Sequence, residues 1–156
     1  MNVEHINPVL TGIKHVIQMV CQVEVTTGKL HISPGIYPEE TLVISVGITG
    51  QLRGQAIFVF SKNVACNLAS RMMMGMPVTE LNDMTKSALA ELANMTMGNA
   101  MTNYSTQGIL LDITPPMVYA GRDLDFSVSD MKLIAIPIIV DEENTFIFNI
   151  AIGEKK

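Results

Sequence analysis

The sequence predicts an α+β protein in which an antiparallel β-sheet carries long α-helices on one side. Amphipathic helical runs are separated by β-rich runs, and the β-rich runs come in pairs joined by short glycine-containing or polar turns. A helix followed by a hairpin occurs in both halves of the chain, which suggests an old internal duplication with pseudo-repeated helix–hairpin halves. The sequence contains no low-complexity stretch and no linker, so we expect one domain over residues 1–156.

The first element is expected to be a helix over residues 7–22. Asn7 suits the N-cap position, and Pro8 suits the first helical position, where the missing N–H of proline costs nothing. Apolar residues then recur at helical spacing, at Val9, Ile13, Val16, Ile17 and Val20. Residues 22–33 alternate around a glycine-centred turn and predict extended chain.

A β-hairpin and a second helix are expected next. Residues 41–50 and 55–61 are rich in β-branched and aromatic residues, and glycines bracket the connection between them. Ser61 immediately precedes the run KNVACNLASRMMMG and suits the N-cap of a helix there. Gly75 and Pro77 are expected to end this helix.

The second half is expected to follow the same order. Thr79 is the expected N-cap of the longest helix, over residues 80–106. Residues 108–114 predict a strand that two prolines terminate, and residues 116–128 are expected to be extended or looped.

The last two strands are expected to form a second hairpin. Residues 131–140 and 144–152 are mostly apolar and flank the polar turn DEEN. Pro137 cannot donate to a ladder of hydrogen bonds, so we expect the first of these strands at a sheet edge or a bulge.

The longest helix carries the candidate site. Apolar residues cover most of its circumference, including a stripe formed by Leu81, Met84, Ala88, Leu92 and Met95. One narrow sector remains, in which Ser87, Glu91, Asn94 and Gly98 follow one another along a single line. Burying the acid or the amide without a partner would cost several kcal/mol. By pattern alone, a solvated helix edge is the simpler interpretation, although such an edge more often carries Lys, Arg and several Glu.

Composition excludes several classes of function. The formal net charge is −5 and lysine and arginine form no cluster, so we expect no nucleic-acid partner. No run approaches the roughly 20 apolar residues needed to cross a bilayer, and the N-terminus lacks the pattern of a signal peptide. Cys21 and Cys66 belong to no paired motif and fit free thiols. We therefore expect a cytoplasmic protein with no membrane partner.

Motifs for a metal, a nucleotide or a serine nucleophile are missing from the sequence. The three histidines lack metal-ligand spacing, and the run RMMMGM fits core packing or a pliable contact surface better than soft-metal binding. The glycine-rich GITGQLRG lacks the lysine and hydroxyl of a P-loop, and Ser87 has no nucleophile-elbow context. We therefore expect no metal site in this chain.

The stretch SALAELANMTMGNA resembles the signature of the CheC, CheX and FliY phosphatases of bacterial chemotaxis. That signature is Asp or Ser, three residues, Glu, two residues, Asn, which Ser87, Glu91 and Asn94 match. The pair Gly98-Asn99 also suits the family, and INPVLTG, MMMGMPVTEL and MTKSALAEL resemble CheX in particular. The likeness thus runs over most of the chain.

This resemblance implies a substrate, a mechanism and an assembly. The substrate would be the aspartyl phosphate of a CheY-like response regulator, with Glu91 pairing to the regulator's active-site lysine and Asn94 orienting the attacking water. Ser87, Gly98 and Asn99 would contact the partner or support the site. The regulator supplies Mg²⁺, so this chain would need no cofactor of its own. The chain would form a homodimer, and the apolar strands of the last hairpin offer a route to it by joining two sheets.

A second ExxN match occurs at the N-terminus, where Glu4 and Asn7 are three residues apart. Pro8 follows immediately, so Glu4 would precede the first helix and not share a helix face with Asn7. We interpret Glu4 as incidental, which leaves one site per chain and favours the CheX type over the two-site CheC type. An alternative function stays open, a non-catalytic adaptor that uses the same helix face to bind a receiver domain or a flagellar-switch component.

Overall fold

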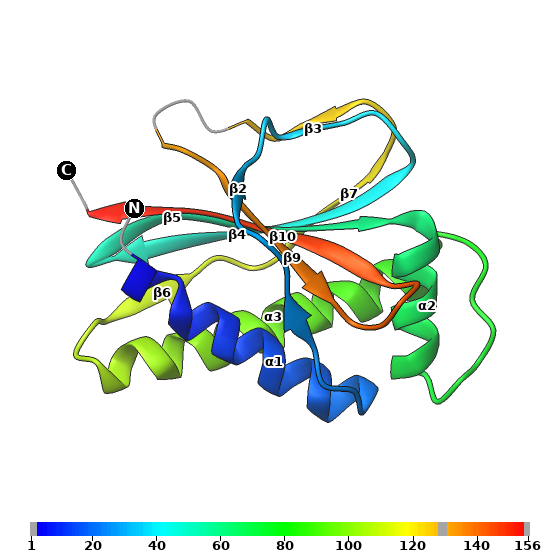
Figure 1. The fold of residues 1–156 in the computed structure, drawn as a ribbon, viewed down its shortest axis with the longest axis horizontal. Coiled ribbons are helices and arrows are strands. Elements are labelled where there is room, and N and C mark those ends of the chain that lie inside the picture. The colour runs from blue at the N-terminus through cyan, green and yellow to red at the C-terminus, as the bar shows by residue number, and fades with distance from the viewer. Residues whose placement is uncertain (1–2, 128–130, 155–156) are drawn as a thin grey trace.

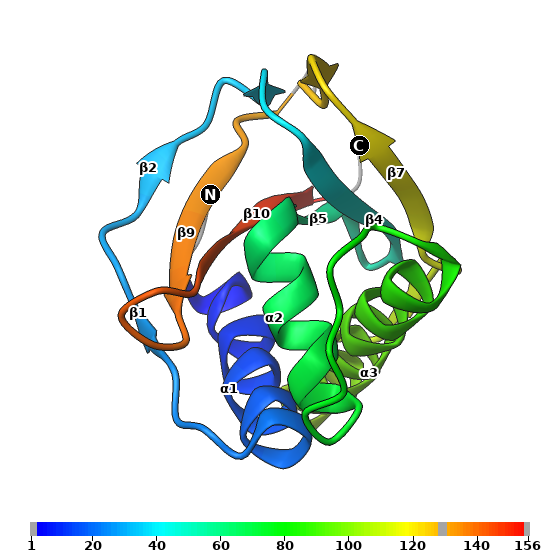
Figure 2. The same ribbon diagram turned by 90° about the vertical axis from the view of Figure 1, so that its right-hand side faces the viewer.

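The computed structural model describes residues 3–127 and 131–154, and it contains a layer of helices packed on one face of an antiparallel β-sheet (Figures 1 and 2). The described helices are the 3₁₀ helix η1 (Val3–His5), α1 (Asn7–Cys21), α2 (Lys62–Met72) and α3 (Asp83–Thr106). The described strands are β1 (Thr26–Thr27), β2 (His31–Ile32), β3 (Ile36–Tyr37), β4 (Thr41–Gly50), β5 (Leu52–Ser61), β6 (Leu111–Ile113), β7 (Met117–Gly121), β8 (Leu124–Asp125), β9 (Ile134–Ile139) and β10 (Thr145–Glu154). The predicted α+β class is confirmed.

Within the described residues, eight strands form the main sheet in the order β1-β9-β10-β5-β4-β6, with β2 also paired to β9 and β7 to β4. The hairpins β4–β5 and β9–β10 are both present, as predicted. They meet at the centre of the sheet, where β10 pairs with β5 in antiparallel register. The last strand of each hairpin therefore joins the two hairpins into one sheet, and one face of this sheet carries the helices.

Of the two alternatives predicted for Pro137, the edge is wrong and the bulge is confirmed, because residues 28–30 lie opposite residues 136–137 and the register shifts by one residue there. The short strands β1 and β2 pair with the outer side of β9, so β9 is an interior strand. Gly28, between β1 and β2, donates its N–H to the carbonyl of Pro137 (N···O 2.9 Å), and a Cβ at position 28 would lie 3.0 Å from the proline ring. The gap between β1 and β2 thus falls where proline has no N–H to offer. Since β9 and β10 are both interior strands, the predicted route to a dimer through them is also wrong.

The main core lies between the helices and the sheet. Phe58 of β5 and Phe148 of β10 are neighbours in the sheet, with ring centroids 5.0 Å apart, and both are buried. Burial of such a side chain contributes about 1.5–3 kcal/mol to folding. The helices contribute apolar residues at the spacing read from the sequence, among them Val9, Ile13, Val16, Ile17, Leu89, Leu92 and Met97. No described helix is long and apolar enough to cross a membrane.

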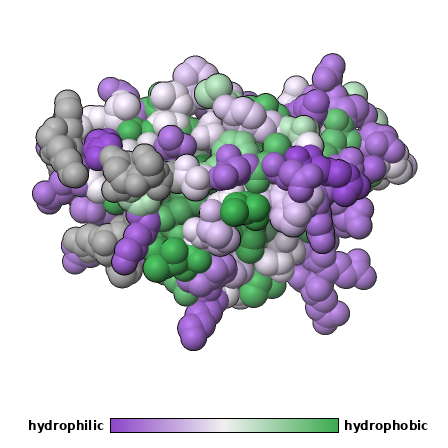
Figure 3. Space-filling view, turned by 90° about the horizontal axis from the view of Figure 1, so that it is seen from above, coloured by the Kyte–Doolittle hydropathy of each residue, from purple (hydrophilic) through white to green (hydrophobic). Residues whose placement is uncertain are grey.

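The other face of the sheet is covered in part by an arm made of β3 and β8. Beneath the arm is a smaller buried cluster, formed by Val43, Ile57, Val59, Leu133 and Ala151. Seen from this side, hydrophobic surface shows as separate patches between polar side chains (Figure 3). The arm therefore gives this face a thin core of its own.

The start of α1 differs from the prediction, whereas the start of α2 does not. Ile6 occupies the N-cap of α1 without a side-chain hydrogen bond, so Asn7 is the first helical residue and not the cap. Glu4 lies in η1, ahead of α1, as expected. Ser61 caps α2, and its hydroxyl accepts the backbone N–H of Val64 at 3.3 Å.

Candidate active site

Helix α3, which carries the predicted site, is anchored at its N-terminus by Asn82. The carboxamide oxygen of Asn82 accepts the backbone N–H of Thr85 (2.9 Å), so the predicted cap at Thr79 is wrong. The buried hydroxyl of Thr85 also donates to the carbonyl of Glu80 at 2.7 Å. The helix begins at Asp83, three residues later than predicted, because the side chain of Asn82 satisfies its first free N–H groups.

The other end of α3 is tied to the start of α1. The fully buried Tyr104 donates its hydroxyl to the carbonyl of His5, and the amide of Asn103 donates to the carbonyl of Pro8 at 3.0 Å. Burial raises the pKa of the Tyr104 phenol, so the group stays protonated and able to donate. These contacts pair the end of α3 with the beginning of α1.

The two helices cross at Gly12. A Cβ at this position would lie 2.9 Å from the carbonyl oxygen of Thr96 and 3.4 Å from the backbone N of Ala100. Only glycine allows the backbones to approach this closely without a shift. Because residue numbers rise along α1 as they fall along α3, the helices run antiparallel. α3 is therefore held against α1, α2 and the sheet, which leaves only its outward side for function.

The predicted line of Ser87, Glu91, Asn94 and Gly98 lies on that outward side, and all four residues are exposed. In the part of the chain that the structure describes, the side chains of Glu91 and Asn94 have no hydrogen-bond or ion-pair partner. Their spacing of three places them side by side on the helix. A Cβ at Gly98 would meet nothing within 4 Å, so the line is open to an approaching surface.

Asn99 differs from the other predicted site residues. It is half-buried, and its side-chain oxygen accepts the amide of Asn103 at 3.2 Å. That oxygen would also lie 3.4 Å from a Cβ at Gly12. Asn99 therefore belongs to the contact between α1 and α3. Of the two roles predicted for it, contacting the partner or supporting the site, this position fits support.

The prediction that Met84 belongs to the buried stripe is wrong, because 57% of this residue is exposed. Met84 lies seven residues before Glu91, which puts both on the same side of α3. The periodicity could not show this, because α3 is apolar nearly all round and no side of it stands out as buried. Sequence reasoning thus missed an exposed apolar residue beside the candidate site.

The predicted line is an exposed face of α3. Three open cavities, of about 570, 460 and 290 Å³, are lined by residues outside this line. Among the residues that the structure describes, His, Cys, Asp and Glu form no group of three that could hold a metal ion. Exposed side chains on one helix face do not by themselves enclose a small substrate, so they suit a macromolecular partner that brings its own cleft.

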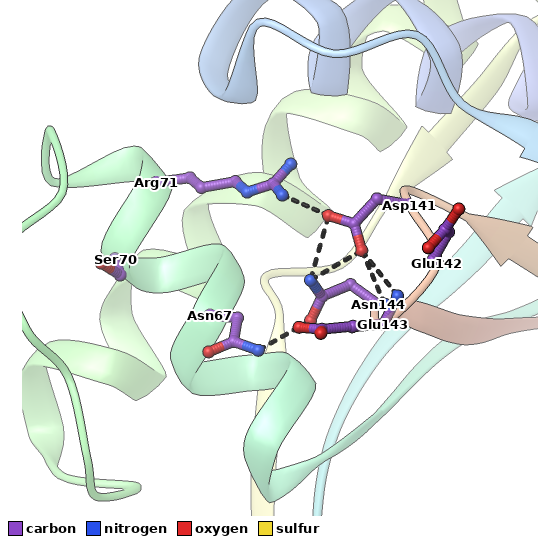
Figure 4. Close-up of a pocket in the computed structure, with 7 residues that line it drawn as sticks. All are labelled: Asn67, Ser70, Arg71, Asp141, Glu142, Glu143 and Asn144. Atoms are coloured by element: carbon purple, nitrogen blue, oxygen red, sulfur yellow. Dashed lines mark hydrogen bonds and ion pairs between the residues drawn. The ribbon is translucent and has the colours of Figure 1, made fainter.

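The largest of these three cavities lies between α2 and the turn that joins β9 to β10 (Figure 4). Its polar groups bind one another: Asp141 accepts from Arg71 and from the side chain of Asn144, whose oxygen accepts the amide of Asn67 at 2.9 Å. The hydrogen bond from the Asn144 side chain, together with the backbone N–H of Glu143 and the nearby Arg71, holds the pKa of Asp141 below its ordinary value. We interpret this cluster as a clamp between α2 and the hairpin.

The antiparallel sheet with helices on one face is shared with several solved structures. A CheC-like superfamily protein from Shewanella sp. PV-4 has a TM-score of 0.86 to this chain at 23% identity, covering 98% of this chain and 99% of that one. A CheX–CheY–BeF3–Mg²⁺ complex from Borrelia burgdorferi contains a chain with a TM-score of 0.79 at 24% identity, covering 98% and 100%. These likenesses establish the fold.

The chain belongs to the CheX family of chemotaxis phosphatases. A family model described as chemotaxis phosphatase CheX matches residues 42–139. The CheY-P phosphatase CheX of Thermotoga maritima is 34% identical over 152 residues, which is 97% of each chain. The family resemblance predicted from the sequence is confirmed, and so is the assignment as a phosphatase.

Proposed function

We propose that this chain hydrolyses the aspartyl phosphate of a CheY-like receiver domain in chemotaxis, with Glu91 pairing to the receiver's lysine and Asn94 orienting the attacking water. The observation that carries this proposal is the pair itself, two adjacent polar side chains that have no partner among the described residues and lie on the exposed side of a helix whose other sides are packed. The relative from Thermotoga maritima is named for activity on CheY-P, and the Borrelia burgdorferi complex joins CheX to CheY.

The physical chemistry of phosphoryl transfer supports this assignment of roles. Catalysis of this reaction depends mainly on positioning and charge stabilisation, and a water-positioning amide is an established solution. Asn94 cannot act as a general base, because a carboxamide has no usable pKa, so its contribution is orientation. The receiver domain supplies Mg²⁺ and a lysine, and the exposed side chains of Glu91 and Asn94 can reach into the receiver's own cleft.

The test is the decay of a phosphorylated receiver domain with and without this protein. Asn94→Ala is expected to lower kcat by about 10²-fold with little change in KM, because it removes a group that acts on the water. Glu91→Ala is expected to raise KM as well, since it removes the charge that pairs with the partner's lysine. Asn7→Ala is the matched control, an exposed asparagine on α1 that should leave both constants unchanged.

Three outcomes would contradict the proposal. Wild-type activity in Asn94→Ala would remove the catalytic assignment, and equal losses in Asn7→Ala would show a second site. Binding of the receiver without dephosphorylation would instead mean an adaptor. Activity is also expected to vanish when EDTA strips the receiver's Mg²⁺, and p-nitrophenyl phosphate should be hydrolysed only at background rate.

We also propose that the protein is cytoplasmic and forms a homodimer. The free thiols Cys21 and Cys66 support the first statement, and the family resemblance supports the second. The dimer contact belongs at a free edge, and no described strand pairs with the outer side of β7, which exposes Met117, Val118 and Tyr119 in part. Light scattering that gives a mass near 17.0 kDa at micromolar concentration would contradict the dimer.

A further inference from the structure

The direction in which Asn94 points depends on how α3 is rotated about its own axis. Side-chain ends lie about 5–6 Å from the axis of a helix, so a rotation of about 10° moves them by about 1 Å. A displacement of about 1 Å at a positioned catalytic group can cost about 10²-fold in rate. The contacts that hold the rotation of α3 therefore contribute to the reaction proposed for Asn94.

The apolar residues of α3 do not define a single rotation. Its fully buried side is flanked by further apolar residues that are half-buried and pack against the main core, Ala88 and Met95 on one flank and Ala90 and Met101 on the other. A small rotation in either direction exchanges one apolar side chain for another and changes the buried apolar area little. Hydrogen bonds are directional, so they distinguish between these rotations.

Asn103 supplies such hydrogen bonds between α3 and α1. Its side-chain amide donates to the carbonyl of Pro8 at 3.0 Å and to the side-chain oxygen of Asn99 at 3.2 Å. Pro8 is buried in the first turn of α1, so this acceptor moves only with that helix. Asn103 is half-buried, which limits the competition of water for its donors. The amide therefore ties α3 to the backbone of the neighbouring helix.

The crossing at Gly12 brings α1 close enough for this contact. Pro8 and Gly12 are four residues apart and lie on the same side of α1. A Cβ at Gly12 would lie 3.4 Å from the side-chain oxygen of Asn99, so Asn99 lies directly against the glycine. Gly12 thus sets the distance between the two helices, and the pair of Asn99 and Asn103 sets the rotation of α3 against α1.

We propose that Asn103 is a positioning residue for the phosphatase reaction, which fixes the rotation of α3 and thereby the direction of the Asn94 side chain. This inference rests on the proposed function. Asn103 follows Asn94 by about two and a half turns, so it acts through the helix and not by contact with the reacting groups. The orientation of the attacking water depends steeply on this direction, whereas the charge pair of Glu91 weakens only gradually with distance. Loss of Asn103 should therefore affect turnover more than affinity.

Asn103→Ala tests the inference in the assay of receiver dephosphorylation. The variant is expected to lower kcat by about tenfold, while KM for the phosphorylated receiver stays within about twofold of the wild type. Asn103→Leu should have the same effect, because leucine restores the volume of the side chain but not its N–H donors. Both substitutions favour the helix, and thermal unfolding would verify that each variant is folded at the assay temperature.

The matched control is Asn67→Ala. Asn67 is also a helical asparagine whose amide donates one hydrogen bond to a neighbouring element, to the side-chain oxygen of Asn144 at 2.9 Å, but it belongs to α2. Its replacement removes a hydrogen bond of the same kind, so the stability to urea should fall by a similar amount. Because this bond does not touch α3, kcat and KM should both stay unchanged.

A double-mutant cycle measures whether Asn103 acts through Asn94. In the background of Asn94→Ala, the further change Asn103→Ala should alter kcat by less than about twofold, because the group that Asn103 positions is already absent. A residue that only stabilised the fold would lower the rate by the same factor in both backgrounds.

An unchanged kcat in Asn103→Ala, an equal loss in Asn67→Ala, or the full tenfold loss repeated in the double variant would overturn the inference. Full activity of Asn94→Ala would instead contradict the proposed function. The two failures are distinguishable, because the first three outcomes are read only where Asn94→Ala is itself impaired.

Discussion

Two glycines on the same helix pair should respond in opposite ways to the same substitution. Gly98 lies in the middle of α3, and a Cβ there would meet nothing within 4 Å. Gly98→Ala therefore raises the helix propensity without a clash, which should raise the free energy of unfolding by about 1 kcal/mol. For a chain of this length, that gain corresponds to an increase in Tm of about 2–4 °C.

Gly12→Ala places the same methyl group 2.9 Å from the backbone oxygen of Thr96. This oxygen belongs to a helix and cannot rotate away, so α1 and α3 must move apart. Overpacking of this kind costs about 1–3 kcal/mol, which exceeds the gain in helix propensity, so we expect a net loss of about 1 kcal/mol and a lower Tm. Gly98→Ala should nevertheless lower phosphatase activity, because its methyl group stands in the line that the receiver approaches.

Thermal and urea unfolding of the two variants and the wild type would measure these effects, with receiver dephosphorylation assayed in parallel. Shifts of Tm in the same direction for both variants would refute the packing argument. A more stable Gly98→Ala with full activity would refute the view that the line around Gly98 is a contact surface. The two glycine variants thus measure the effect of helix packing on stability separately from the effect of the exposed line on docking.

The remaining predictions concern the clamp, the helix anchor and the core. The pKa of Asp141 is lowered chiefly by Asn144, so Asp141 should stabilise the fold above the ordinary pKa of aspartate and lose this effect as pH falls through its lower folded-state value. Urea unfolding should therefore show a stability difference between wild type and Asp141→Asn that shrinks in acid, and a pH-independent difference would contradict this. Tyr104→Phe removes the hydrogen bond to His5 and should cost about 1 kcal/mol in the same assay, whereas unchanged stability would deny that bond a role. Phe58→Ala leaves a cavity in the core and should cost about 3–5 kcal/mol; a loss below 1 kcal/mol would mean that the core repacks.

The predictable parts of the fold are those specified by local sequence. The two hairpins follow from alternation and short turns, and α3 follows from an apolar run too long for a strand. The pair of Glu91 and Asn94 could be predicted because both residues belong to one helix, so that their spacing alone places them side by side without any tertiary contact. Its exposure is consistent with the interpretation as a site, and the catalytic roles stay a prediction.

The parts that could not be predicted depend on contacts between distant segments. The two-residue strands β1 and β2 carry no sequence signal that they cover β9, so the sequence predicts an edge or a bulge at Pro137 without deciding between them. The cap of α3 fell on Asn82 instead of Thr79 because several residues of the connection can cap a helix, and the packing of the loop selects one. The exposure of Met84 depends on which side of an almost uniformly apolar helix meets its neighbours. The internal duplication stays a prediction.

The exposed pair of Glu91 and Asn94 on α3 also has a consequence for engineering. Because the acid and the amide come from one helix and are less than one turn apart, any stable α-helix reproduces their relative geometry. The reactive pair is therefore portable and can be grafted onto an unrelated helical scaffold. The packing that anchors α3 does not come with the pair, because the crossing at Gly12 and the hydrogen bond from Asn103 to the carbonyl of Pro8 both involve α1. A transplanted helix should accordingly retain activity only on a scaffold that holds it as firmly.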